Sequence, residues 1–296
     1  MNIVLLSGGS GKRLWPLSND IRSKQFIKFF KNEELGDYES MIQIMYRQIK
    51  NIDKDAKITI ATARTQVSSI YNQIGRDVAV SIEPCRRDTF PAIALATSYL
   101  HDVQGIDENE AVVVCPVDPY VHEDYFEALK ELHELAEKGD ANLVLMGIEP
   151  TYPSEKYGYI IPNSKDDISY VKPDIETARK YIENGALWNG GVFAYKLKYV
   201  LDRAHELIDF TDYEDLFDKY ETLTKISFDY AVVEKEPEIL VKRFKGEWKD
   251  LGTWNTLTEA MEETSIGKAI LNDTCKNVHV VNELGVPVVC MGLTDV

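Results

Sequence analysis

The stretch Ile3–Ser18, IVLLSGGSGKRLWPLS, begins with a short apolar run and continues into a loop that contains three glycines. An apolar run of this length predicts a buried β-strand. Glycines directly after a strand let backbone N–H groups approach an anion closely, and Arg13 adds positive charge and a fork of donors. Because open α/β sheets bind ligands at the carboxyl ends of their strands, the stretch predicts a phosphate-binding loop at a sheet edge.

Two other kinds of glycine loop do not fit this stretch. A Walker loop requires a glycine where Leu6 stands and a hydroxyl residue where Arg13 stands. A dinucleotide-binding fingerprint requires a third glycine at the position of Leu14, and Trp15-Pro16 prevents the tight helix start of that motif. What remains is a loop that binds phosphate through its backbone N–H groups and a basic side chain.

The sequence that follows alternates short β-branched runs with helical patterns. The predicted strands are residues 2–6, 57–62, 78–82, 111–115 and 142–148. The predicted helices are residues 40–50, 65–75, 89–101 and 123–138. Alternation of this kind forms right-handed βαβ crossovers. We therefore predict an α/β, Rossmann-like core with a mixed, mostly parallel sheet that is flanked by helices.

The pattern changes after residue 150. Further strands are expected at residues 157–161, 168–171, 188–195 and 238–243, and further helices at residues 174–183, 197–209 and 229–235. Because no linker rich in glycine or serine interrupts them, residues 1–262 are predicted to form one domain. Residues 263–296, with strands expected at 277–281 and 286–290, resemble the start of a small β-rich unit. An apolar run stops just before Val296, so we expect the chain to be part of a longer protein.

Charge and cysteine content limit the class of protein. A net charge of -16 argues against a nucleic-acid partner, because such binding depends on a basic surface. The exception is residues 12–31, where six cations accompany one anion; a local positive patch of this kind suits a small polyanion such as a nucleotide. No apolar stretch is long enough to span a membrane, and no secretory signal opens the chain. The four cysteines have no metal-binding spacing, so we expect reduced thiols and a cytoplasmic protein.

Nine short motifs follow one another along the chain. They are GGSGKRLWPLS (8–18), SKQF (23–26), EPCRRDTFPAIALA (83–96), PVD (116–118), YGYI (157–160), KPD (172–174), LWNGGVF (187–193), SFDYAVVEK (227–235) and WKDLGTW (248–254). In type and order they resemble the sugar-1-phosphate nucleotidyltransferases, in particular the mannose-1-phosphate guanylyltransferases. The resemblance implies transfer of a nucleotidyl group from GTP to a hexose 1-phosphate, with release of pyrophosphate. It identifies residues 1–262 as the catalytic domain and residues 263–296 as the start of a small C-terminal β domain.

The resemblance also implies roles for the basic loop. Gly8, Gly9 and Gly11 would form the backbone cradle for the phosphates. Arg13 would hold the β- and γ-phosphates, and Lys24 would steady the α-phosphate. An ordinary surface lysine is the alternative for Lys24.

Two aspartates match the metal-binding positions of the family. Asp118 follows the apolar run AVVVC, and Asp250 stands two residues before Gly252. Magnesium prefers hard oxygen ligands, typically one or two carboxylates together with phosphate oxygens and water. We therefore expect a Mg²⁺ site at Asp118 and Asp250, although each aspartate could instead serve only a turn.

The motif EPCRRDTFPA resembles the guanylyltransferase version of this segment, and that resemblance favours GTP as the nucleotide. Guanine presents two adjacent donors, N1–H and the exocyclic amine, which a carboxylate such as Glu83 or Asp88 can accept. Asp88 and Thr89 also stand at the start of a predicted helix, so an N-cap is the competing interpretation.

The sugar phosphate is assigned to a third group of residues. By resemblance, Lys172 binds the phosphate, and Gly158, Tyr159 and Asn189 contact the sugar. Val171 stands where the family usually has a glutamate, and a valine cannot accept hydrogen bonds from hydroxyls. The resemblance predicts mannose 1-phosphate, and the missing glutamate leaves another hexose 1-phosphate, or another nucleoside triphosphate, as the alternative. A non-catalytic homologue that binds sugar nucleotide is a second alternative, and a homodimer is the assembly considered.

Overall fold

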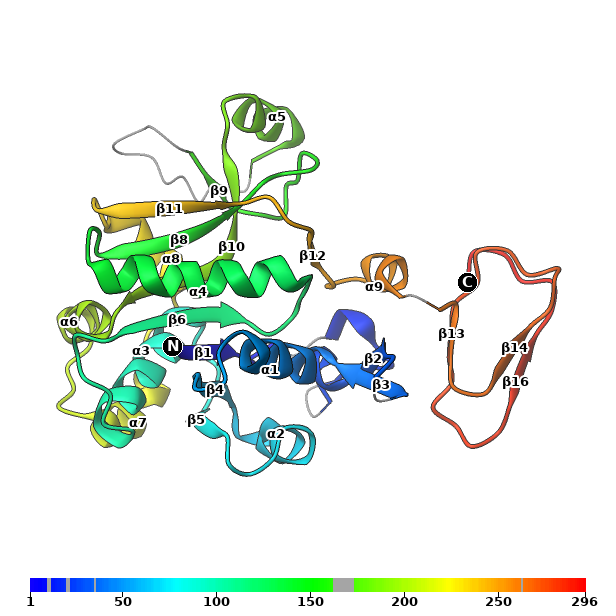
Figure 1. Ribbon diagram of the computed structural model, residues 1–296, viewed down its shortest axis with the longest axis horizontal. Helices are drawn as coiled ribbons and strands as arrows, with labels where there is room; N and C mark the ends of the chain where they lie inside the picture. Colours follow the sequence, from blue (N-terminus) through cyan, green and yellow to red (C-terminus); the bar gives the residue numbers. More distant parts are fainter. Residues whose placement is uncertain (10–11, 20–21, 35, 162–172, 262) are drawn as a thin grey trace.

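The computed structural model describes residues 1–9, 12–19, 22–34, 36–161, 173–261 and 263–296 (Figure 1). The central sheet has eight strands in the order β11-β8-β10-β6-β1-β4-β5, with β9 paired to β10. Their bounds are β1 (Asn2–Leu6), β4 (Lys57–Ala63), β5 (Ala79–Glu83), β6 (Ala111–Pro116), β8 (Leu143–Ile148), β9 (Tyr159–Ile160), β10 (Leu187–Lys196) and β11 (Ile239–Phe244). β10 is antiparallel to its neighbours, and the other pairs are parallel. The predicted mixed, mostly parallel sheet is confirmed.

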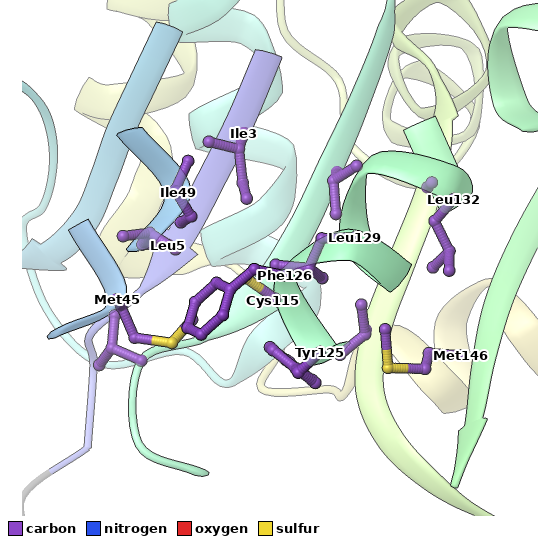
Figure 2. Close-up of a cluster of buried hydrophobic side chains, with 14 of the residues drawn as sticks. Ile3, Leu5, Met45, Ile49, Cys115, Tyr125, Phe126, Leu129, Leu132 and Met146 are labelled. Carbon is purple, nitrogen blue, oxygen red and sulfur yellow. The ribbon is translucent and has the colours of Figure 1, made fainter. Parts of the chain in front are cut away.

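Helices cover both faces of this sheet (Figure 1). Their bounds are α1 (Met41–Ile52), α2 (Val67–Gln73), α3 (Thr89–Ser98), α4 (Glu123–Lys138), α5 (Ile175–Glu183), α6 (Leu197–Leu207), α7 (Tyr213–Lys219), α8 (Phe228–Ala231) and α9 (Trp254–Ala260). Side chains alternate between the faces of a strand. Ile3 and Leu5 of β1 therefore pack with α1 and α4, as Figure 2 shows, whereas Val4 packs with α3 on the opposite face.

Helix α4 has the bounds predicted from its apolar stripe. Phe126, Leu129 and Leu132 are at most 2% exposed and lie on the side of α4 that faces the sheet. The helix ends where Gly139 adopts a φ of +73°, a conformation that favours glycine. With 16 residues it is the longest described helix, and none of the described helices combines the length and apolarity needed to cross a membrane.

Several predicted elements are shorter or interrupted in the structure. The strand expected at 157–161 retains only the two residues of β9, and the helix expected at 89–101 continues beyond Ser98 as a wider π-type turn, Tyr99–Val103. The helix expected at 229–235 divides into α8 and a 3-10 turn, Val233–Lys235. The strand expected at 168–171 lies outside the described residues.

Four short strands near the carboxyl edge of the sheet were not predicted. They are β2 (Lys28–Asn32), β3 (Asp37–Ser40), β7 (Pro119–Val121) and β12 (Trp248–Asp250). β2 and β3 form an antiparallel hairpin, whereas β7 and β12 pair from distant parts of the chain. In the β7–β12 pair Asp250 lies opposite Pro119, so it is brought next to Asp118.

The last part of the chain forms short parallel pairs. Its strands are β13 (Ser265–Ile266), β14 (Ala269–Leu271), β15 (Val280–Val281) and β16 (Val288–Cys290). β13 pairs with β15 and β14 with β16, and no described strand of the central sheet joins them. Figure 1 shows this segment at the side of the molecule beyond α9. The division into a catalytic domain and a separate β unit stays a prediction.

Candidate active site

The glycine loop after β1 lies at the carboxyl edge of the sheet. Gly8 and Gly9 border a cavity of about 360 Å³. Within the described ranges, the N–H groups of these two glycines donate to no protein acceptor. They are therefore available to bind an anion in the cavity. Gly11, the third predicted member of the cradle, lies outside the described residues.

Two buried glutamines hold the loop. Gln25 donates from Nε2 to the carbonyl of Ser7 at 2.9 Å. Gln66 donates from Nε2 to the hydroxyl of Ser23 at 2.6 Å and to the carbonyl of Gly9 at 3.3 Å. Both glutamines are at most 1% exposed, so their bonds to Ser7 and Ser23 are shielded from water. Gln25 belongs to the motif SKQF but was given no role, and Gln66 lies in none of the motifs.

Lys24, the residue after Ser23, is buried and forms ion pairs with both predicted metal ligands. Lys24 is 5% exposed. Its Nζ lies 2.8 Å from Asp118 Oδ2 and 3.4 Å from Asp250 Oδ1, and it donates to the carbonyl of Leu251 at 3.4 Å. The interpretation of Lys24 as an ordinary surface lysine is therefore wrong. The β7–β12 pairing supplies the two carboxylates, and η2 (Lys24–Phe26) supplies the ammonium.

Arg13 reaches the same cluster from η1 (Lys12–Leu14). A Cβ built on Gly252 would lie 2.8 Å from Asp250 Oδ2 and 2.9 Å from Arg13 Nη2, so both charged groups pack against this glycine backbone. Any larger residue at position 252 would displace one of them. Arg13, Lys24, Asp118 and Asp250 are thus brought together from four separate parts of the chain.

The two aspartates provide a donor set that fits a divalent metal ion. The described residues contain no group of three or more His, Cys, Asp or Glu side chains that could bind a metal. Asp118 Oδ1 and Asp250 Oδ2, however, have no protein donor among the described residues, and both side chains are about one third exposed. Two hard carboxylate oxygens that leave the other positions to phosphate and water are the usual ligands of Mg²⁺.

Glu83 lies at the end of β5 and borders the same cavity as the glycine loop. Its Oε2 accepts a hydrogen bond of 2.8 Å from the hydroxyl of Tyr220, and its Oε1 lies 3.3 Å from the position of a Cβ on Gly8. Burial raises the pKa of the Glu83 carboxyl, while the hydrogen bond from Tyr220 and the charge of Arg86 act in the opposite direction. Sequence reasoning did not find Tyr220.

Asp88 and Thr89 also line the cavity, and both have a structural role. The Asp88 carboxylate accepts from the N–H of Thr89 at 2.8 Å and caps α3, which confirms the N-cap interpretation. Asp88 has a φ of 71°, a conformation that residues other than glycine rarely adopt. The Thr89 hydroxyl accepts from the N–H of Phe228 at 2.8 Å, which ties α3 to α8.

The predicted sugar-binding residues are only partly available. The Tyr159 side chain is 0% exposed, and its hydroxyl is satisfied by the backbone of Ser154 at 2.9 and 3.0 Å. The hydroxyl is therefore not available to a sugar, and a sugar contact at Tyr159 through its backbone stays a prediction. Asn189 donates from Nδ2 to Asp229 at 2.8 Å, and its N–H donates to the carbonyl of Gly158 at 2.9 Å. Lys172 lies outside the described residues.

A second cavity, of about 390 Å³, is lined by Asp250 and not by Asp118. Its walls include four aromatic residues, Tyr152, Tyr157, Trp188 and Trp248. Successive rings pack with centroids 4.8 to 5.4 Å apart. The indole N–H groups of both tryptophans are buried without a hydrogen-bond partner in the described structure. The charged cluster thus has Asp118 on one cavity and Asp250 on the other.

A family model described as nucleotidyl transferase matches residues 2–266, which include every element of the central sheet. This chain belongs to the nucleotidyl transferase family. The glycine loop, the carboxylate pair and both cavities of this nucleotidyl transferase lie within the matched region.

The relatives of this nucleotidyl transferase agree with the resemblance seen in its motifs. It is 30% identical to a mannose-1-phosphate guanylyltransferase of Escherichia coli over 99% of this chain and 69% of the relative. It is 29% identical to the xanthan biosynthesis protein XanB of Xanthomonas campestris, over 93% of this chain and 63% of XanB. A crystal structure from Thermus thermophilus, described as mannose-1-phosphate geranyltransferase, matches this chain with a TM-score of 0.78 and 27% identity. The match covers 99% of this chain and 90% of the Thermus thermophilus chain.

The chain spans about two thirds of the length of the curated relatives, 69% of the first and 63% of the second. The family model and the structural match establish the family and the fold of this chain.

Proposed function

We propose that this nucleotidyl transferase joins mannose 1-phosphate to GTP and releases GDP-mannose and pyrophosphate. The observation that carries the proposal is the buried ammonium of Lys24 between the carboxylates of Asp118 and Asp250. Asp118 borders the same cavity as the available N–H groups of Gly8 and Gly9. The E. coli relative, named a mannose-1-phosphate guanylyltransferase, supports the choice of substrates.

The proposed reaction brings two anions together. A phosphate oxygen of the sugar 1-phosphate attacks the α-phosphorus of GTP. The bond from that phosphorus to the oxygen that bridges the α- and β-phosphates breaks, and pyrophosphate leaves. No general base is required, because the nucleophile is already an anion. The site must therefore mainly neutralise charge and align the two phosphates.

The residues of the cluster match these requirements. In the proposal, the N–H groups of Gly8 and Gly9, with those of Gly11, hold the triphosphate. Arg13 binds the β- and γ-phosphates as they leave, and Lys24 steadies the α-phosphate as its negative charge increases. Burial of Lys24 favours this role, because a shielded cation acts more strongly on a nearby anion than one in water.

Asp118 and Asp250 would hold Mg²⁺. Arg13 and Lys24 balance the charge of the two carboxylates, so the four groups alone are formally neutral. A bound divalent ion would supply the net positive charge that offsets the repulsion between the two substrates. The oxygens Asp118 Oδ1 and Asp250 Oδ2, which have no protein donor among the described residues, support this assignment.

The two cavities suggest how the substrates divide between them. We place guanine beside Glu83, whose carboxylate accepts from N1–H and the exocyclic amine, near Asp88 and Thr89. We place the sugar between Asn189 and the aromatic cavity, since aromatic ring faces suit the apolar face of a sugar ring. Lys172 would bind the sugar phosphate, as the family resemblance implies.

A screen of product formation tests the proposal. Purified protein with Mg²⁺ is given each of four nucleoside triphosphates together with mannose, glucose, galactose or fucose 1-phosphate, and released pyrophosphate is measured. We expect the highest rate with GTP and mannose 1-phosphate, and no release when Mg²⁺ is chelated. A higher rate with another hexose would replace mannose but keep the chemistry. Absence of pyrophosphate from every pair would contradict catalysis and favour a homologue that only binds sugar nucleotide.

We also infer a cytoplasmic location, where the four free cysteines would stay reduced. The homodimer stays a prediction, which light scattering on the purified chain tests.

A further inference from the structure

Glu83 is held by a residue far away in the sequence. Tyr220 lies in η5 (Tyr220–Thr222), 137 positions after Glu83, and donates its hydroxyl to Glu83 Oε2 at 2.8 Å. Tyr220 is 0% exposed and Glu83 is 6% exposed. The Tyr220 ring packs in a cluster with Leu95 of α3 and Leu216 of α7. Its hydroxyl therefore has a fixed position beside Glu83, which lines the same cavity as Gly8 and Gly9.

The hydrogen bond from Tyr220 sets the orientation of the carboxylate. The last torsion of a glutamate side chain is broad, so the plane of a free carboxylate rotates easily. With Oε2 held by Tyr220, Oε1 lies beside the backbone of Gly8, and Glu83 remains part of the cavity wall. Each carboxylate oxygen can accept more than one hydrogen bond, so both can still accept from a ligand.

A second contact joins the same two segments. Arg87, four residues after Glu83, donates from Nη2 to the carbonyl of Glu221, the neighbour of Tyr220. Phe90 at the start of α3 also donates its N–H to the carbonyl of Ile226 at 3.2 Å. The segment that carries Tyr220 is thus attached at several points to the segment from Glu83 to Phe90.

Two neighbouring groups and burial act on the pKa of the Glu83 carboxyl. Arg86, on the same loop, and Tyr220, from η5, both lower the pKa of the Glu83 carboxyl, while burial raises it. Loss of the phenol would therefore raise this pKa. A protonated carboxyl would then present a donor where a guanine amine requires an acceptor.

From this geometry we infer that Tyr220 is a positioning residue for base selection, which fixes the Glu83 carboxylate in the orientation that accepts from both N1–H and the exocyclic amine of guanine. The inference rests on the proposed use of GTP. It adds to that proposal a second residue, remote in the sequence and absent from the motifs, on which the choice of base depends.

The test compares GTP with ITP, whose base retains N1–H but lacks the exocyclic amine. Binding of each nucleotide to the full chain is measured by calorimetry, which does not require turnover. Tyr220→Phe should weaken GTP binding roughly tenfold and ITP binding clearly less, so that the preference for GTP shrinks. Where the chain is active, the same variant should raise KM for GTP and change kcat less than twofold.

Two further variants separate positioning from general loss of structure. Tyr195→Phe removes another buried phenol, which pairs with the Thr97 hydroxyl at 3.0 Å, and should leave the GTP/ITP ratio unchanged. In a Glu83→Gln background, Tyr220→Phe should have no additional effect on that ratio, because the group that it positions is gone.

The pH dependence provides a readout that a purely structural role would not change. KM for GTP should rise as the pH falls through the pKa of Glu83, and in Tyr220→Phe this rise should begin at higher pH. An unchanged GTP/ITP ratio in Tyr220→Phe, with GTP still bound, would overturn the inference and leave the proposed function intact. A wild-type chain that binds GTP and ITP equally would overturn it as well. Failure of the pyrophosphate screen alone would count against the proposed function and not against base selection.

Discussion

Replacing Lys24 with methionine should separate catalysis from metal binding. Methionine keeps much of the length of the side chain but removes the ammonium that lies 2.8 Å from Asp118 and 3.4 Å from Asp250. The transfer rate should fall by a factor on the order of 10²–10³, the scale of losing one preorganised charge-stabilising donor. Affinity for Mg²⁺ should instead increase, because the two carboxylates lose the cation that competes for them.

The size of this increase follows from Coulomb's law. An ion bound to Asp118 would lie on the order of 4 Å from the Lys24 ammonium, since both would contact one carboxylate. Even in the dielectric of bulk water, a dication and a single charge at that distance repel by about 2 kcal/mol, or about thirtyfold in Kd. The aspartates are about one third exposed, so solvent screens this repulsion and the larger value for a dry interior does not apply.

Calorimetric titration with Mg²⁺ and measurement of pyrophosphate release test both parts. Lys28→Met is a matched control, because Lys28 also belongs to the positive patch of residues 12–31. Its side chain is exposed and, among the described residues, forms an ion pair only with Asp37, at 3.3 Å. Its rate and metal affinity should equal those of wild type. A Lys24→Met rate within threefold of wild type would remove Lys24 from the mechanism. Unchanged or weaker Mg²⁺ binding would refute the metal site at Asp118 and Asp250.

Three other changes test the remaining parts of the site. Arg13→Ala should lower the transfer rate by a factor on the order of 10²–10³, measured by pyrophosphate release, and a loss below threefold would exclude Arg13 from phosphate binding. Asp250→Asn should shift the activation curve to higher Mg²⁺, and an unchanged curve in a metal titration would refute its assignment. Gln66→Leu should cost about 1–3 kcal/mol of unfolding free energy in urea, because it leaves the buried Ser23 hydroxyl without its donor, and should weaken GTP binding by loosening Gly9. Wild-type stability together with wild-type GTP affinity would contradict the role of Gln66.

The sequence was sufficient to predict the centre of the fold. β1, β4 and β6 are buried runs of β-branched residues between turn signals, and α4 has one clear apolar stripe, so local pattern alone indicates them. β7 and β12 have only three residues each and pair across more than a hundred positions, and such strands give no periodic signal. The pairing that places the two carboxylates together could therefore not be derived from pattern.

The same contrast holds within the site. The residues predicted to bind phosphate or metal lie in recognisable motifs, and Arg13, Lys24, Asp118 and Asp250 come together in the structure. The supporting residues Gln66 and Tyr220 have no such signal. They act through hydrogen bonds to groups distant in sequence, and only coordinates reveal those. Burial is equally invisible in a motif: the sequence does not show that the Tyr159 hydroxyl is already bonded to the backbone of Ser154.

The most direct test of the central claim follows the fate of each phosphate of GTP. The chain is given mannose 1-phosphate, Mg²⁺ and GTP labelled with radioactive phosphorus at either the α- or the γ-position, and the products are separated. We predict that α-label appears in a sugar nucleotide and that γ-label appears in pyrophosphate. Transfer of γ-label to the sugar, with release of GDP, would indicate a kinase and contradict nucleotidyl transfer at the Lys24, Asp118 and Asp250 cluster.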